Sequence, residues 1–295
     1  MFGRSQELSR RSVRALTLAA LLCALVPGGA GAHGDLHDQI ADVTRQIERR
    51  PADARLYFKR GELHRLHGER KAALADYDRA ALRDPGLGEV DLGRGKALFE
   101  AGRLPESRAA LDRFLAKRPD HADARLSLAR VLVSLRLPDE ADAEFARAID
   151  LAGRPKPDLY FERAKALAAA ARLDAAIRVI DDGIARLGPL AALDDLAVSI
   201  ERRRGNHGAA LARLDRLHAG RARRESWLAR RGEILAEAGR GAEARASFLA
   251  AQSSIENLPP RLRRTRAIER LERDVKASLG RLEAKSRKEK TDAKG

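Results

Sequence analysis

The side chains best suited to metal chemistry are four histidines in two close pairs. His33 and His37 are four residues apart, and His64 and His67 are three apart. Imidazole binds copper, nickel or zinc, and cleavage of the chain before His33 would place a free amine beside its imidazole. No cluster of acids or further histidines completes either pair, so histidines that only pack or lie at the surface are the other interpretation. A metal-associated accessory role at His33 and His37 is therefore an alternative function.

Motifs of catalysis are missing from the sequence. It has no glycine-rich phosphate loop, no G-x-S-x-G nucleophile elbow and no H-E-x-x-H zinc-binding helix. The adjacent acids at 181–182 and 194–195 point to different faces of a helix, where we expect them to be solvated. The single cysteine, Cys23, falls in a segment that we expect to be removed, which leaves no thiol for catalysis or a zinc site. We predict that the protein is not an enzyme and holds no cofactor.

Residues 1–32 resemble a cleavable export signal. Four arginines within residues 4–14 precede an apolar run at 15–26, and the small residues Ala30, Gly31 and Ala32 follow it. The apolar run is shorter than the roughly 20 residues that span a membrane. We therefore expect an exported protein, periplasmic or secreted, in a bacterial envelope.

A repeat of 34 or 35 residues runs through the middle of the chain. Its anchor is small in five units and valine in one: Gly61, Gly95, Ala129, Ala164, Val198 and Gly232. Sixteen residues after each anchor stands a large apolar residue: Tyr77, Leu111, Phe145, Ile180, Leu214 and Phe248. Glycine lies seven residues after four of the anchors, at 68, 102, 205 and 239. This pattern predicts two helices in each unit, joined by a tight turn and packed closely where a small residue meets a large one.

This pattern of two antiparallel helices in each unit of 34 residues resembles that of the tetratricopeptide repeat family. The resemblance covers residues 54–256 and implies an all-α fold, a right-handed α-solenoid of six helix-turn-helix repeats. Alanine, leucine, arginine and glutamate, which dominate the sequence, are strong helix formers. An irregular stretch at residues 154–157 interrupts the repeat, and we expect the stack to bend or loosen there.

Separate helices are expected to cap the two ends, because the terminal faces of a solenoid need a polar cover. Residues 33–53 carry apolar side chains every three to four positions, and Pro51 ends the pattern. Residues 257–280 contain two adjacent prolines and then carry a similar apolar face. Beyond residue 283 the chain is rich in lysine and lacks apolar residues other than alanine. We predict that residues 281–295 form a basic disordered tail.

The resemblance further implies that the first helices of the repeats line a concave groove. On that template, positions three before and one after each anchor face inward and share one helical face, because they are four apart. The predicted groove combines an apolar row with a basic row: Phe58, Leu92, Leu126 and Phe161, and Lys96, Arg130 and Lys165. It would bind an extended or helical segment that carries apolar and acidic side chains. The other interpretation is that these bases are solvated and pair with acids nearby: Glu89, Asp123 and Asp158.

The chain is strongly basic, with a formal net charge of +15. Residues 1–32 carry four arginines and one glutamate, so the remaining chain has a charge of +12. Such a charge favours acidic proteins and anionic membrane surfaces, which a C-terminal group of arginines could contact: Arg261, Arg263, Arg264, Arg266, Arg270 and Arg273. Nucleic acid is not an expected partner, because the aromatic residues that would stack on bases occupy core positions of the repeats. The sequence thus predicts an exported adaptor or scaffold that binds a protein or peptide in its groove.

Overall fold

A computed structural model describes residues 30–219 and 223–292 of the chain. Within these residues every regular element is a helix, which confirms the predicted all-α class. The helices are α1 (Ala30–Arg49), α2 (Ala54–Leu66), α3 (Arg70–Arg83), α4 (Glu89–Glu100), α5 (Leu104–Lys117), α6 (Ala122–Ser134), α7 (Pro138–Leu151), α8 (Pro157–Ala169), α9 (Leu173–Leu187), α10 (Ala191–Arg203), α11 (His207–His218), α12 (Glu225–Glu237), α13 (Gly241–Glu256), α14 (Pro260–Arg263) and α15 (Arg266–Asp292). Most of the predicted export signal lies outside the described residues.

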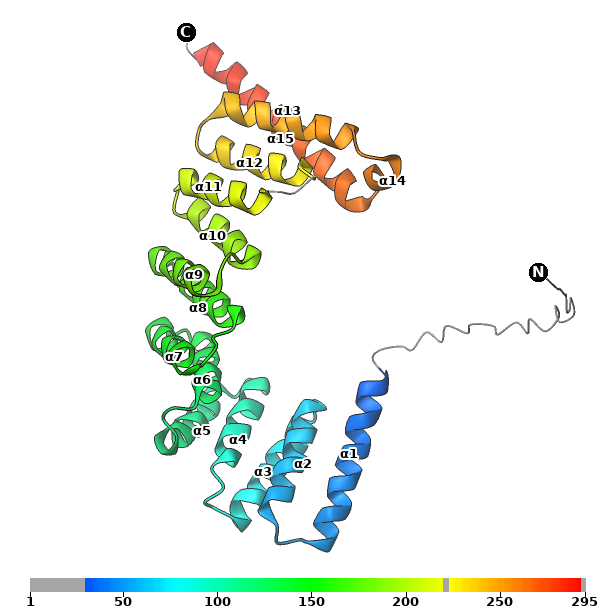
Figure 1. The fold of residues 1–295 in the computed structure, drawn as a ribbon, viewed down its shortest axis with the longest axis vertical. Helices are drawn as coiled ribbons and strands as arrows, with labels where there is room; N and C mark the ends of the chain where they lie inside the picture. Colours follow the sequence, from blue (N-terminus) through cyan, green and yellow to red (C-terminus); the bar gives the residue numbers. More distant parts are fainter. Residues whose placement is uncertain (1–29, 220–222, 293–295) are drawn as a thin grey trace, which may run out of the picture.

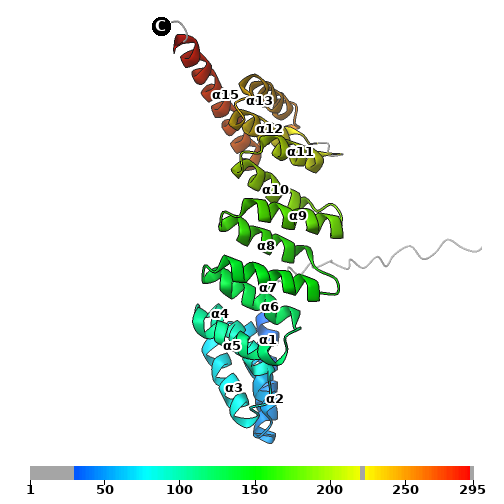
Figure 2. The same cartoon turned by 90° about the vertical axis from the view of Figure 1, so that its left-hand side faces the viewer.

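Six helix pairs stack into a solenoid, as the repeat predicts. The first helix of each pair is α2, α4, α6, α8, α10 or α12, and the second is the helix that follows it. Figure 1 shows the pairs following one another along an arc, with α1 at one end and α13 to α15 at the other. Figure 2 shows α4 to α11 layered one above another along the same long axis. Within the described part of the chain, no helix has the length and apolar content needed to cross a membrane.

The anchor glycines lie where the two helices of a pair touch. A Cβ atom added at Gly61 would lie 2.8 Å from the ring of Tyr77, and one added at Gly95 would lie 2.7 Å from Leu111. Both large side chains are fully buried. The structure thus confirms that a small anchor and the large residue sixteen positions later pack against each other.

The turn between the two helices has the same backbone conformation in all six repeats. Four repeats place glycine there, with φ between 73° and 84°. The third and fourth repeats place Arg136 and Ala171 at this position, each with φ of 60°. A side chain in this left-handed region costs roughly 1–2 kcal/mol. Helix packing therefore imposes the turn even where the sequence lacks the glycine that favours it.

The first helices of neighbouring repeats contact each other unevenly along the stack. The backbones of neighbouring first helices approach each other closely at α2–α4, α4–α6 and α8–α10, but not at α6–α8 or at α10–α12. The second helix α7 still packs on α8, and its buried Ile149 belongs to the core cluster around Tyr160. Because α10 and α12 show the same pattern, the bend or loosening expected at residues 154–157 stays a prediction.

The N-terminal end follows the prediction, but the C-terminal end differs from it in two ways. Val43 and Ile47 of α1 are buried in the core of the first repeat. At the other end, the expected single capping helix is broken between α14 and α15, and α15 continues through residues 281–292, where the sequence predicts a disordered tail. The helix continues because Leu282 still packs against the last repeat and because no glycine or proline follows before residue 292.

Candidate protein-binding groove

The apolar row of the predicted groove lies on four successive first helices, α2, α4, α6 and α8. Phe58, Leu92, Leu126 and Phe161 are all half-buried. Phe58 lies beside the buried ring of Tyr77, at 6.0 Å between ring centroids, and Leu92 and Phe161 pack on the cores of their own repeats. These side chains therefore stabilise the solenoid and offer only part of their surface to a partner.

Two members of the basic row form ion pairs between repeats. Lys96 Nζ lies 2.6 Å from Asp123 Oδ2, which belongs to the next first helix. The guanidinium of Arg130 makes two hydrogen bonds of 2.7 Å to the carboxylate of Glu162 on α8, and these bonds raise the pKa of Arg130. Lys165 is exposed and has no ion pair within 4.0 Å among the described side chains. The row therefore ends in one cation that is available to a partner.

The interpretation that the bases pair locally is thus correct in part. Lys96 pairs with Asp123 as that interpretation predicts, but Arg130 pairs with Glu162, and Glu89 pairs with Arg118 at 2.9 Å. Exposed ion pairs contribute only about 0–1 kcal/mol. A carboxylate from a partner could therefore replace Asp123 or Glu162 at small cost, so local pairing and partner binding are compatible.

Sequence reasoning missed a second set of ion pairs on the first helices. Arg65 pairs with Glu100 at 2.7 Å, and Arg202 pairs with Glu237 at 2.5 Å. Both pairs join residues 35 apart. Burial would lower the pKa of Arg65, but Glu62 and Glu100 outweigh it and raise the pKa. The sequence did contain a signal for these two pairs. In both cases an arginine lies four residues after one anchor, and a glutamate lies five residues after the next anchor.

One acid that we expected to be solvated is buried. Asp194 is only 6% exposed, and its Oδ1 lies 3.1 Å from Arg216 and 3.8 Å from Arg213, both on α11. The adjacent Asp195 is exposed and pairs with Arg230 at 2.6 Å. The two acids do point to different faces, as predicted. The expectation of a solvated pair is wrong for Asp194, because its face of α10 packs against α11.

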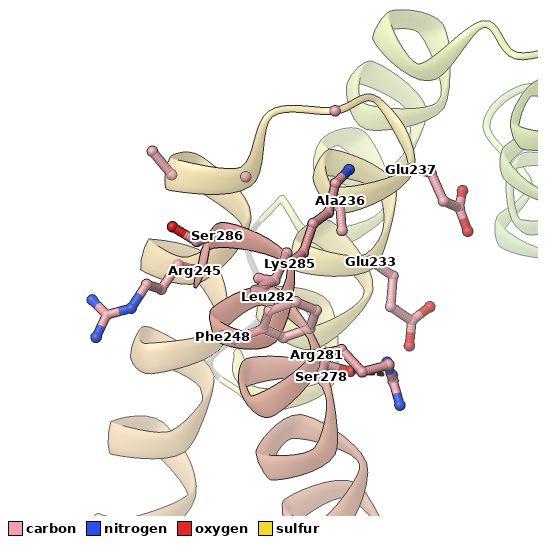
Figure 3. Close-up of a pocket in the computed structure, with 13 residues that line it drawn as sticks. Glu233, Ala236, Glu237, Arg245, Phe248, Ser278, Arg281, Leu282, Lys285 and Ser286 are labelled. Carbon is pink, nitrogen blue, oxygen red and sulfur yellow. Dashed lines mark hydrogen bonds between the residues drawn. The ribbon is translucent and has the colours of Figure 1, made fainter. Parts of the chain in front are cut away.

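A pocket between the last repeat and α15 also escaped prediction. It has a volume of about 660 Å³ and lies between α12, α13 and the end of α15. Figure 3 shows Phe248 and Leu282 at its centre, with Arg245 on one side and Glu233 and Arg281 on the other. The sequence could not indicate this pocket, because four of its thirteen lining residues belong to the segment of α15 that was expected to be disordered: Arg281, Leu282, Lys285 and Ser286.

The histidines do not form a metal centre in the described residues. The rings of His37 and His67 lie 6.4 Å apart, and Glu69 is shared by His64 at 2.5 Å and His67 at 3.0 Å. Hydrogen bonds from these two histidines lower the pKa of Glu69. No group of three or more histidine, cysteine or acidic residues suited to a metal occurs among the described side chains. The side chain of His33 lies outside them, so the metal role at His33 and His37 stays a prediction.

The middle of the chain matches a known repeat family. Residues 92–154 match the family described as Tetratricopeptide repeat. This stretch therefore belongs to the tetratricopeptide repeat family. No curated protein matches its sequence. Proteins of this family generally serve as non-catalytic scaffolds for interactions between proteins.

Solved structures of tetratricopeptide repeat proteins share the fold of this chain. It is similar to the C-terminal part of a TPR repeat-containing protein from Cytophaga hutchinsonii, at a TM-score of 0.62 and 11% identity over 77% of this chain and 93% of that one. PilW, a type IV pilus biogenesis factor, matches at 0.55 and 21%, over 64% and 88% of the two chains. YrrB, a TPR protein with an unusual peptide-binding site, matches at 0.51 and 24%, over 60% and 90%. At these identities the likeness establishes the fold.

Proposed function

We propose that this tetratricopeptide repeat protein is an exported adaptor, periplasmic or secreted, whose groove binds a protein or peptide segment. The observation that carries the proposal is the surface formed by Arg130, Phe161 and Lys165, in which two exposed cations flank a half-buried aromatic ring. YrrB, which shares the fold, has a peptide-binding site. A partner segment with apolar and acidic side chains fits this surface best.

The positions of these three residues suggest how such a segment would bind. Phe161 and Lys165 lie about one turn apart on α8, and Arg130 of α6 reaches the same helix through Glu162. A partner carboxylate could bind Lys165 directly, and a second could replace Glu162 in the planar guanidinium fork of Arg130. An apolar side chain between them would cover the exposed part of Phe161, at about 25 cal/mol for each Å² removed from water.

A library of displayed random peptides tests this binding preference. We expect the chain that begins at His33 to select peptides enriched in aspartate or glutamate beside leucine or phenylalanine. Lys96→Glu, Arg130→Glu and Lys165→Glu together should weaken binding of those peptides by more than about tenfold, because like charges placed together at an interface cost several kcal/mol. Affinities of the selected peptides for both forms give the measurement.

The matched control reverses two arginines of the second helix α5 and the arginine that directly follows this helix. Arg108 is half-buried and Arg113 and Arg118 are exposed, and each pairs with an acid, at 2.6, 3.0 and 2.9 Å respectively. Their replacement by glutamate changes the net charge by the same amount and should leave peptide binding intact. Equal binding by the groove variant, or equal loss in the control, would show that the groove does not select the peptides.

A further inference from the structure

Four arginines gather at the C-terminal end of the solenoid. Four exposed arginines lie on α14, directly after it and at the start of α15: Arg261, Arg263, Arg264 and Arg266. No acidic residue occurs between positions 258 and 268. Figure 1 shows α14 at the margin of the C-terminal end of the arc. We call residues 261–266 the arginine tip.

The positive charge of the arginine tip is almost uncompensated. Arg261, Arg264 and Arg266 have no acid within 4.0 Å among the described side chains, and Arg263 reaches Glu272 only at 4.0 Å. The arginines of α5 differ, since those at positions 108, 113 and 118 each have an acid at 3.0 Å or less. The tip therefore concentrates positive potential in a protein whose other helices neutralise much of theirs.

An apolar residue and a pocket accompany this charge. The side chain of Leu262 is 38% exposed between two arginines. It also lines a pocket of about 390 Å³ between the start of α12 and the helices α14 and α15. The apolar part of the pocket wall is Leu262, Ala267, Ile268 and Leu271. The polar and charged part is Arg223, Ser226, Thr265, Arg270 and Asp274. The acid in this set, Asp274, lies 4.0 Å from Arg270.

We infer that the arginine tip is a docking surface for an anionic phospholipid membrane. The guanidinium groups of Arg261, Arg264 and Arg266 bind headgroup phosphates, with which their planar forks form paired hydrogen bonds. Leu262 enters the boundary between headgroups and acyl chains, and the neighbouring pocket offers hydroxyl groups to a headgroup. A lipid surface fits better than an acidic protein segment, because the exposed cations lie within six residues at the margin of the solenoid beside an exposed leucine and do not line an elongated groove.

This membrane contact does not use the groove residues, but it would bring the groove near a bilayer. The groove residues lie on α2 to α8, whereas the tip follows the sixth repeat. One helical solenoid could therefore hold a membrane with its C-terminal end and a partner segment with its earlier repeats. The membrane contact is peripheral, because it consists of arginines bound to lipid headgroups and of one leucine side chain.

Vesicle co-sedimentation with the chain that begins at His33 tests the inference. We expect binding to vesicles that contain phosphatidylglycerol, none to pure phosphatidylcholine vesicles, and weaker binding at raised ionic strength. Each basic residue near an anionic surface contributes about fivefold. Arg261→Gln, Arg264→Gln and Arg266→Gln together should thus reduce the partition coefficient by about a hundredfold. Leu262→Ser should reduce it by several-fold.

The control removes the same number of charges from α5. Arg108→Gln, Arg113→Gln and Arg118→Gln should change vesicle binding by less than about threefold, and thermal unfolding would show that both variants are folded. The inference is overturned if the tip variant binds vesicles as well as the unmodified chain, or if the α5 control loses as much. It is also overturned if polyglutamate binds the tip while phosphatidylglycerol vesicles do not, since the partner would then be an acidic protein.

Discussion

Replacing Asp76 with asparagine is expected to lower the free energy of unfolding by about 3–5 kcal/mol. The carboxylate of Asp76 is 1% exposed on α3, and it accepts hydrogen bonds from Arg60 Nε at 2.6 Å and Nη2 at 2.8 Å and from Arg79 at 2.7 Å. Asparagine keeps the shape but leaves the largely buried Arg60 without a counter-charge. Urea unfolding at pH 7 measures the loss. Asp182→Asn, at an exposed pair with Arg186, should cost less than about 1 kcal/mol.

The same substitution has an expected pH dependence. Burial raises the pKa of Asp76, but hydrogen bonds from Arg60 and Arg79 outweigh it and leave the pKa below its ordinary value. The charge therefore stabilises the fold above the unfolded-state pKa of about 3.9, and this contribution is lost as the pH falls through the folded-state pKa. The difference between the two proteins should be full at pH 7 and shrink in acid below about pH 4. A difference that stayed constant down to pH 3 would contradict the ion pair as its cause.

Gly232→Ala is expected to destabilise the last repeat by about 1–3 kcal/mol, because it overpacks a filled core. An added Cβ would lie 2.8 Å from Cδ1 and Cε1 of Phe248, and the ring is only 2% exposed. The ring can yield only by moving its helix or by turning toward the pocket that it lines beside Leu282. Denaturant unfolding followed by circular dichroism gives the change in free energy.

Gly280→Ala is the matched comparison for this prediction. Gly280 is exposed within α15, and a Cβ added there meets nothing within 4 Å. Alanine should therefore stabilise this helix by roughly 0.5–1 kcal/mol. The same substitution should therefore lower the free energy of unfolding at Gly232 and raise it at Gly280, because only Gly232 packs against a large side chain. A stability change of the same sign at both positions would not fit the close contact between α12 and α13.

The repeat architecture could be predicted because its information is local and recurs. The spacing of Gly61, Gly95 and Gly232 from Tyr77, Leu111 and Phe248 indicates which two helices pack and which side chains meet. The turn at Arg136 and Ala171 could not be predicted from residue type, because neither residue favours a positive φ. There the packing of two helices outweighs a backbone preference of about 1–2 kcal/mol.

The C-terminal end was harder to predict because tertiary contacts decide it. Past Gly280, only Leu282 extends the apolar face of α15, and it packs against the core of the last repeat. Without knowledge of this contact, a composition rich in lysine indicates disorder. The groove shows a similar limit. Sequence placed Arg130 and Lys165 on one row, but it did not show that Glu162 binds Arg130, since that pair depends on how α6 and α8 are rotated relative to each other.

Photo-crosslinking in the native host tests most directly whether the groove holds a partner. A photoreactive phenylalanine derivative at Leu126, on α6, should give a covalent adduct of discrete mass. The same group at Ala143, an exposed residue of the second helix α7, should give none, and reversing the charges of Lys96, Arg130 and Lys165 should abolish the adduct at 126. Adducts from position 143 in place of 126, or an adduct at 126 that survives the charge reversal, would contradict partner binding in the groove.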